Sequence, residues 1–265
     1  MEFLSLLGKT LLLRPYVFIF LAIALATSVW FMGKHRTGLF FLLTWVTAFV
    51  CEFSSTRTGI PFGWYVYTGS TVGQELYFSD VPFMDSLSFS FLLFTSYCLA
   101  LTFLLPAQGR GITMVMRADQ ALRTSPPVLV LTVMFFVLLD VVIDPVALRG
   151  DRWFLGQIYY YPDPGWHFGV PLANYGGWAV VGLIAFGLYQ RLDQRFPNRP
   201  PPTRNVTRPL LFGCTLYYGI LAFNLAMTFW IGEPLIGITG LLIYLPITAF
   251  LLLKLTGCLP LQSGS

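Results

Sequence analysis

Seven long apolar runs limit what this chain can fold into more than any other feature of its sequence. They lie at about 15–32, 38–56, 84–105, 127–148, 172–190, 209–231 and 237–256. A helix that crosses a bilayer needs about 20 mainly apolar residues, and the runs have roughly that length. Only 11% of the residues are charged, against about 25% in soluble domains. The sequence therefore predicts an all-α, polytopic membrane helix bundle, with residues 1–265 forming a single membrane-embedded domain.

The basic residues between the runs predict how the bundle is oriented. One alternate set of loops carries 11 of the 16 Lys and Arg residues, namely Lys34, Arg36, Arg110, Arg117, Arg123, Arg191, Arg195, Arg199, Arg204, Arg208 and Lys254. By the positive-inside rule these loops are cytoplasmic, which puts the N-terminus outside and the C-terminus inside. The net charge of +4 is thus attributed to topology and not to nucleic-acid binding. The first 14 residues are expected to form an interfacial helix or a frayed leader.

Four carboxylates lie in or at the ends of the predicted spans, and they are Glu52, Asp85, Asp140 and Asp144. A charge at mid-helix costs about 2.5–3.5 kcal/mol on insertion scales, so an intramembrane acid is a functional candidate by default. The predicted orientation brings all four to a similar depth, toward the external leaflet. For Asp85 a structural role is an alternative, because anions are favoured near a helix N-terminus.

The pair Asp140 and Asp144 has the spacing i, i+4, which puts both side chains on one helix face about 6 Å apart. Two like charges this close in a low-dielectric site repel, so we expect at least one acid to stay protonated near neutral pH. Such a group can act as a general acid. The sequence favours Asp140 for that role, because it lies a full turn deeper than Asp144.

Pairing with arginines at the interface is the structural alternative for these acids. In that case Arg57 would neutralise Glu52, and Arg149 or Arg152 would neutralise Asp144. The carboxylates would then stabilise the fold and would not need to react.

Two stretches are too particular to be generic membrane sequence. The first is Glu52 followed by SSTRTGIPFGWYVYTG (54–69), and the second is DVVIDPVALRGDRW (140–153) leading to WHFGVPLANYGGW (166–178). Together they resemble the integral-membrane carotenoid hydratases, which include γ-carotene and bisanhydrobacterioruberin hydratases. The resemblance covers the second, fourth and fifth spans and both long external loops. In the third span VPFMDSLSFSF, with Asp85, departs from the family pattern.

The resemblance implies addition of water across the terminal C=C of a linear carotenoid end group, without a cofactor. An acid would protonate the alkene, and water would capture the resulting tertiary carbocation. The candidate catalytic residues are Asp140, Asp144 and Glu52. The candidate substrate-binding residues are Tyr65, Tyr67, Asp85, Trp153, Trp166, His167, Asn174 and Trp178. Asn174 would position water, and aromatic faces would stabilise the cation. His167 is either a proton relay or a hydrogen-bonding group at the interface.

The expected partners are a hydrophobic carotenoid, water and the lipid bilayer, in the cytoplasmic membrane of a bacterium or archaeon. No metal is expected, because the cysteines and the two histidines lack ligand spacing. Three alternatives stay open: another acid-initiated isoprenoid enzyme, such as a cyclase or isomerase, a proton-coupled membrane transporter, or a carotenoid-binding protein.

Overall fold

The computed structural model describes residues 2–109, 114–117, 120–196 and 204–257. Within these residues, seven helices are long and apolar enough to cross a membrane, as predicted. They are α2 (Pro15–Met32), α3 (Lys34–Thr58), α4 (Phe83–Leu104), α6 (Pro126–Ala147), α7 (Leu172–Asp193), α8 (Thr207–Trp230) and α9 (Pro234–Thr256). The largest difference from prediction is at α3, which begins at Lys34 and not at residue 38. Hydropathy marks only the apolar part of a span, whereas the helix continues into the polar interface.

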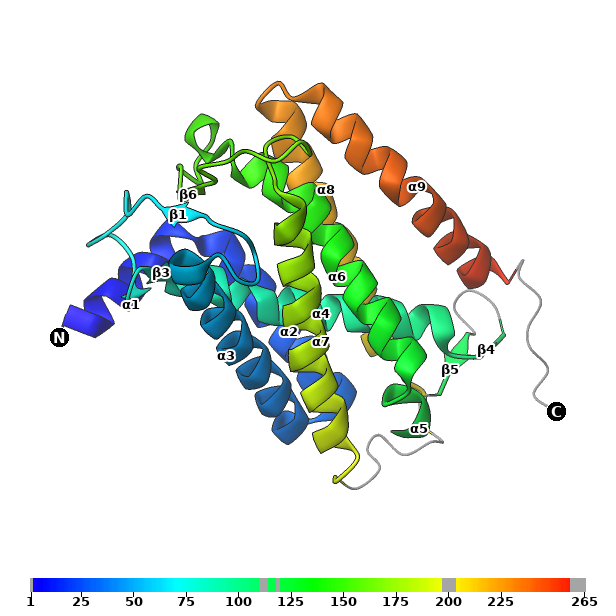
Figure 1. Ribbon diagram of the computed structural model, residues 1–265. Helices are drawn as coiled ribbons and strands as arrows, with labels where there is room; N and C mark the ends of the chain where they lie inside the picture. Colours follow the sequence, from blue (N-terminus) through cyan, green and yellow to red (C-terminus); the bar gives the residue numbers. More distant parts are fainter. Residues whose placement is uncertain (1, 110–113, 118–119, 197–203, 258–265) are drawn as a thin grey trace.

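Helix α4 is the centre of the bundle. It packs against α3, α6 and α8. In its apolar 18-residue stretch 78% of the residues are buried, more than in any other candidate span. Helix α7 packs on α3 and α6, α2 packs on α8, and α9 lies at the edge of the bundle against α8 and α6 (Figure 1). The acids of α3, α4 and α6 are therefore carried by helices that are neighbours.

Short elements connect the spans. They are α1 (Glu2–Leu13), α5 (Gln120–Arg123), η2 (Gly150–Arg152), and three two-stranded antiparallel pairs: β1 (Val66–Tyr67) with β6 (Tyr159–Tyr160), β2 (Tyr77–Phe78) with β3 (Val81–Pro82), and β4 (Ala107–Gln108) with β5 (Val115–Met116). The pairing of β1 with β6 joins the two long loops, residues 59–82 and 148–171, at one end of the bundle (Figure 1). We call this the loop end.

A buried ion pair and a hydrogen bond fasten the N-terminal segment to the loop end. Arg14, which the charge pattern assigns to an external loop, is fully buried, and its Nη2 lies 3.2 Å from Oε1 of Glu75. The backbone N–H of Leu76 donates to Thr10 Oγ1 over 2.8 Å. At the opposite end of the bundle, Arg36 and Arg123 both pair with buried Asp193. At both ends of the bundle, some charged residues therefore form ion pairs inside the protein.

Candidate active site

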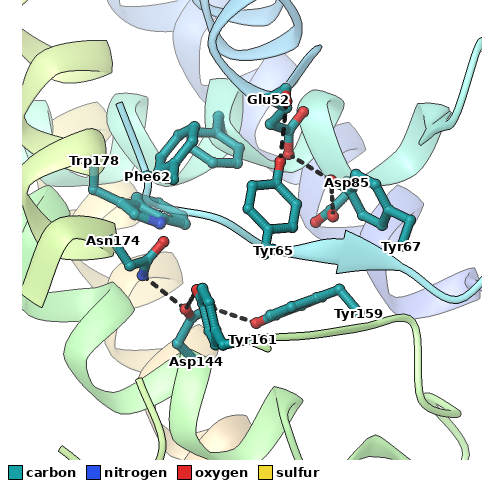
Figure 2. A pocket seen from close by; sticks show the side chains of 11 residues that line it. Glu52, Phe62, Tyr65, Tyr67, Asp85, Asp144, Tyr159, Tyr161, Asn174 and Trp178 are labelled. Carbon is teal, nitrogen blue, oxygen red and sulfur yellow. Dashed lines mark hydrogen bonds between the residues drawn. The ribbon is translucent and has the colours of Figure 1, made fainter. Parts of the chain in front are cut away.

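A cavity with about 340 Å³ of empty space lies at the loop end, beneath the β1–β6 pair. Its walls combine acids, tyrosines and apolar rings, which are Glu52, Phe62, Tyr65, Tyr67, Asp85, Phe89, Asp144, Tyr159, Tyr161, Asn174 and Trp178 (Figure 2). Three of the four acids singled out in the sequence line this one cavity. The sequence prediction that acids from separate spans share a site therefore agrees with the cavity lining for Glu52, Asp85 and Asp144.

The loop after α3 carries two of the tyrosines into this cavity. Helix α3 ends at Gly59, whose φ of +75° is left-handed and favours glycine. Phe62 then packs directly on α7 at Gly177. The contact is close enough to need glycine there, because a Cβ at this position would lie 2.2 Å from the Phe62 ring. The N–H of Phe62 donates to Ser55 Oγ over 2.9 Å. The chain is thereby turned back so that Tyr65 reaches the centre of the cavity (Figure 2).

Tyr67 joins the first pair of acids. Its hydroxyl lies 2.8 Å from Asp85 Oδ2 and 3.2 Å from Glu52 Oε1. Burial, with the nearby Asp85 and Glu52 carboxylates, raises the pKa of Tyr67 well above its usual value, so this hydroxyl keeps its proton. A phenol has only one proton to donate. Both contacts are therefore hydrogen bonds only when one of the two acids is itself protonated.

Asn174 joins the second pair of acids. Its Nδ2 donates to Asp140 Oδ2 and to Asp144 Oδ2, each over 2.7 Å. Asp144 also accepts from the Tyr159 hydroxyl at Oδ1 (2.7 Å) and from the Tyr161 hydroxyl at Oδ2 (3.1 Å). Asp140 is fully buried, and its Oδ1 has no hydrogen-bond partner among the described residues. Asp144 thus faces the cavity and is held by three donors, whereas Asp140 lies behind it.

Tyr159 and Tyr161 are site residues that the sequence reasoning missed. Their two-residue spacing puts both side chains on one face of an extended segment, and the same alternation in Tyr65 and Tyr67 was available as a signal. Pairing of β1 with β6 places Tyr67 opposite Tyr159. Tyr65 makes edge contacts with Tyr159 and Tyr161 at ring-centroid distances of 6.1 and 6.2 Å. Burial, with the nearby Asp144 carboxylate, raises the pKa of both Tyr159 and Tyr161, which keeps them as donors.

The predicted tryptophans divide between two places in the site. Trp178 lines the acid cavity and stacks on Phe89 with ring centroids 4.1 Å apart. Trp153 lines an adjoining apolar cavity, and its Nε1 donates to the Val146 carbonyl over 3.1 Å. Both residues therefore contribute aromatic surface near the acids.

Two other predicted residues lie outside the cavity wall. The side chain of Trp166 is 83% exposed. His167 Nδ1 is hydrogen-bonded to the Tyr175 hydroxyl, and partial burial lowers the pKa of His167, which favours the neutral imidazole. Of the two roles left open for His167, this geometry matches the hydrogen-bonding one.

The arginines at the loop end do not neutralise the acids of the cavity. Arg57 pairs with Asp80 over 2.8 Å, outside the cavity. Arg149 and Arg152 both pair with Glu233, Arg149 over 3.0 Å. The structural alternative that assigned these arginines to the intramembrane acids is therefore wrong. In the described ranges of the chain, no three His, Cys, Asp or Glu side chains gather as a metal site requires.

Comparison with known proteins identifies the family. A family model described as carotenoid biosynthesis protein matches residues 13–246, most of the chain. The chain belongs to the carotenoid biosynthesis protein family. This membership confirms the resemblance found in the sequence motifs. The seven helices that are long and apolar enough to cross a membrane agree with the integral-membrane resemblance.

The chain is also similar to bisanhydrobacterioruberin hydratase of Haloarcula japonica, with 29% identity over 189 residues. The alignment covers 70% of this chain and 57% of that protein, so the chain spans little more than half the length of this relative. No solved structure matches this carotenoid biosynthesis protein.

Proposed function

We propose that this protein is a hydratase that adds water across the terminal C=C of a linear carotenoid end group. The family and the hydratase relative support the substrate class and the reaction. One observation carries the proposal: three carboxylates, with tyrosine hydroxyls as their partners, line one cavity, and no arginine of the described residues lines it with them. Acids in that environment can hold a proton and deliver it to an alkene, which is a very weak base.

The first step is proton transfer from a carboxylic acid to the less substituted alkene carbon. The π electrons of the alkene form the new C–H bond, and a tertiary carbocation remains. The sequence favoured Asp140 as the donor because of its depth, but Asp144 is the member of the pair that lines the cavity. We therefore assign proton delivery to Asp144 and a positioning role to Asp140, which shares the Asn174 amide with it.

The second step is capture of the cation by water. A lone pair of the water oxygen forms the C–O bond, and the surplus proton of that water passes to a carboxylate. Glu52 and Asp85 lie across the cavity from Asp144, and whichever of the two is ionised can accept it. Return of a proton to Asp144 completes the cycle, with no net change other than the added water.

The aromatic walls would stabilise the cation between these steps. Tyr65 stands between Glu52 and Asp144 (Figure 2), and Trp178 forms a further wall. A cation over an aromatic face gains about 2 kcal/mol or more when both are desolvated. A ring loses its aromaticity when it forms a bond to the cation, so the π faces trap the cation less readily than a carboxylate would.

Expression in a host that makes linear carotenoids tests the proposal. Pigment masses from cells with this protein are compared with those from cells carrying the Asp144→Asn variant or an empty vector. A gain of one water mass per reacted end, absent in both controls, is the expected result. Unchanged mass with altered absorption would instead indicate isomerisation or cyclisation. Pigments unchanged in both mass and absorption would refute the proposal.

A further inference from the structure

A second, larger cavity opens beside the acid cavity. It has about 750 Å³ of empty space, part of which is open to solvent, against about 340 Å³ for the acid cavity. Its walls come from α2, α4, α6 and α8, with the segment that contains Trp153 at one side. It shares Asp85, Asp144, Tyr159 and Trp178 with the acid cavity, so the two cavities adjoin at the reactive carboxylates.

The wall of this second cavity away from the acids is apolar. Val17, Leu92 and Ile220 are typical of its lining. Two of its polar side chains use their donors within their own helices: Ser88 Oγ donates to the Asp85 carbonyl over 2.7 Å, and Asn224 Nδ2 donates to the Ile220 carbonyl over 2.9 Å. A ligand in this cavity would meet mainly hydrocarbon, with the carboxylates at the end shared with the acid cavity.

Aromatic rings close the outer side of the cavity between α2 and α8. The rings of Tyr16 and Phe223 stack at 5.2 Å, and Phe20 meets Phe223 edge-on at 5.8 Å. Phe154, whose side chain is 52% exposed, makes an edge contact with Tyr16 at 5.5 Å. The cavity is therefore separated from the surface of the bundle by side-chain contacts alone at this place.

We propose that this second cavity binds the hydrocarbon chain of the linear carotenoid next to its reactive end, with the chain leaving between Tyr16 and Phe223 into the lipid. The chemistry of the cavity matches that of the chain. The hydrocarbon would contact the apolar wall, and its reactive end would then meet the acids. A chain seated there has its terminal double bond beside Asp144 and Asp85. This assignment rests on the proposed function for the identity of the chain, but binding is measurable apart from hydration.

The cavity also explains why a long, apolar substrate would react only at its end. The four shared residues, which include Trp178 stacked on Phe89, form the boundary between the two cavities. In the proposed pose the terminal group of the chain reaches this boundary, beyond which Tyr65 and Glu52 line the acid cavity. Internal double bonds of the chain stay in the apolar part of the second cavity, away from Glu52, which lines the acid cavity alone.

Binding of lycopene to the full chain in lipid nanodiscs tests the proposal, with quenching of tryptophan fluorescence as the readout. Trp153 and Trp178 line the second cavity, so a polyene seated there quenches them, whereas lipid-dissolved polyene affects wild type and variants equally. Ile220→Phe, which fills the cavity from α8, should weaken binding at least tenfold. Ile238→Phe, the same change on the exposed face of α9, should leave binding within twofold of wild type.

A second pair of variants protects the test against misfolding. Val17→Phe fills the same cavity from α2, and Val130→Phe makes the same change at an exposed position of α6. Wild-type affinity in a folded Ile220→Phe or Val17→Phe protein would overturn the chain site, even if cells with the wild-type protein hydrate carotenoids. Weakened binding in those variants would support the chain site even if no hydration is found, so the two proposals can fail separately.

Discussion

Replacement of Asp144 by asparagine is the perturbation that most directly tests the assignment of the acid. Asparagine keeps the size of the side chain, but its amide cannot deliver a proton to an alkene. Loss of general acid catalysis typically lowers a rate by about 10²–10⁴-fold. The matched variant is Asp140→Asn, which changes the same chemical group one turn away, behind the cavity wall.

The hydrogen bonds predict how the two variants differ in stability. Asp144 accepts from Tyr159 at one oxygen and from Asn174 and Tyr161 at the other. An amide at that position must present its NH₂ to at least one of these donors, which leaves a buried donor unsatisfied at a cost of about 1–3 kcal/mol. Asp140 has a free buried Oδ1, so an amide NH₂ there displaces no donor. We therefore expect Asp144→Asn to be the less stable of the two.

The assay is the mass of pigments in the carotenoid-producing host, scaled to the amount of folded protein in the membrane. Asp144→Asn should lose hydration by 10²–10⁴-fold, whereas Asp140→Asn should retain a measurable fraction. Near wild-type hydration by Asp144→Asn, together with none by Asp140→Asn, would show that the deeper aspartate is the donor. If neither change matters, proton delivery falls to Glu52 or Asp85, and the reasoning from cavity walls is refuted.

The remaining predictions concern the partner hydroxyl, the buried ion pair, the packing of the loop and the orientation. Tyr67→Phe removes the shared donor of Glu52 and Asp85, and we expect lower hydration with unchanged lycopene binding, because Tyr67 does not line the second cavity; weakened binding would contradict this. Glu75→Gln leaves Arg14 buried without its countercharge and should destabilise the protein by about 3–5 kcal/mol in detergent unfolding, whereas Asp80→Asn at the exposed pair should cost about 1 kcal/mol or less. Gly177→Ala should displace Phe62 and lower Tm, since the added Cβ would lie 2.2 Å from that ring, whereas Gly187→Ala, with open space around it, should not. A thiol introduced at Ser70 should react with an impermeant reagent in intact cells and one at Gln194 should not; the reverse pattern would invert the predicted topology.

The acids illustrate how far the sequence could be taken. The cost of a charge in the membrane identifies Glu52, Asp85, Asp140 and Asp144 without any coordinates. Which of them faces the substrate depends on where the packed helices leave a cavity. Asp140 and Asp144 share one face of α6, and the cavity reaches only Asp144. Depth along the helix favoured Asp140, whereas the cavity wall favours Asp144. The depth of a residue follows from its position in the sequence, but its exposure to a cavity depends on how other helices pack.

Hydropathy by itself determined the seven helices of this protein, because a segment in lipid must satisfy its backbone hydrogen bonds within itself and must present apolar side chains. The motifs around Glu52 and Asp144 likewise indicated the family. Only the tertiary structure decided the partners of each charge. Pairing of β1 with β6 places Tyr159 and Tyr161 beside Asp144. Arg57 pairs with Asp80, and Arg149 pairs with Glu233. These contacts join segments far apart in the chain, so they follow from the register and depth at which the helices pack.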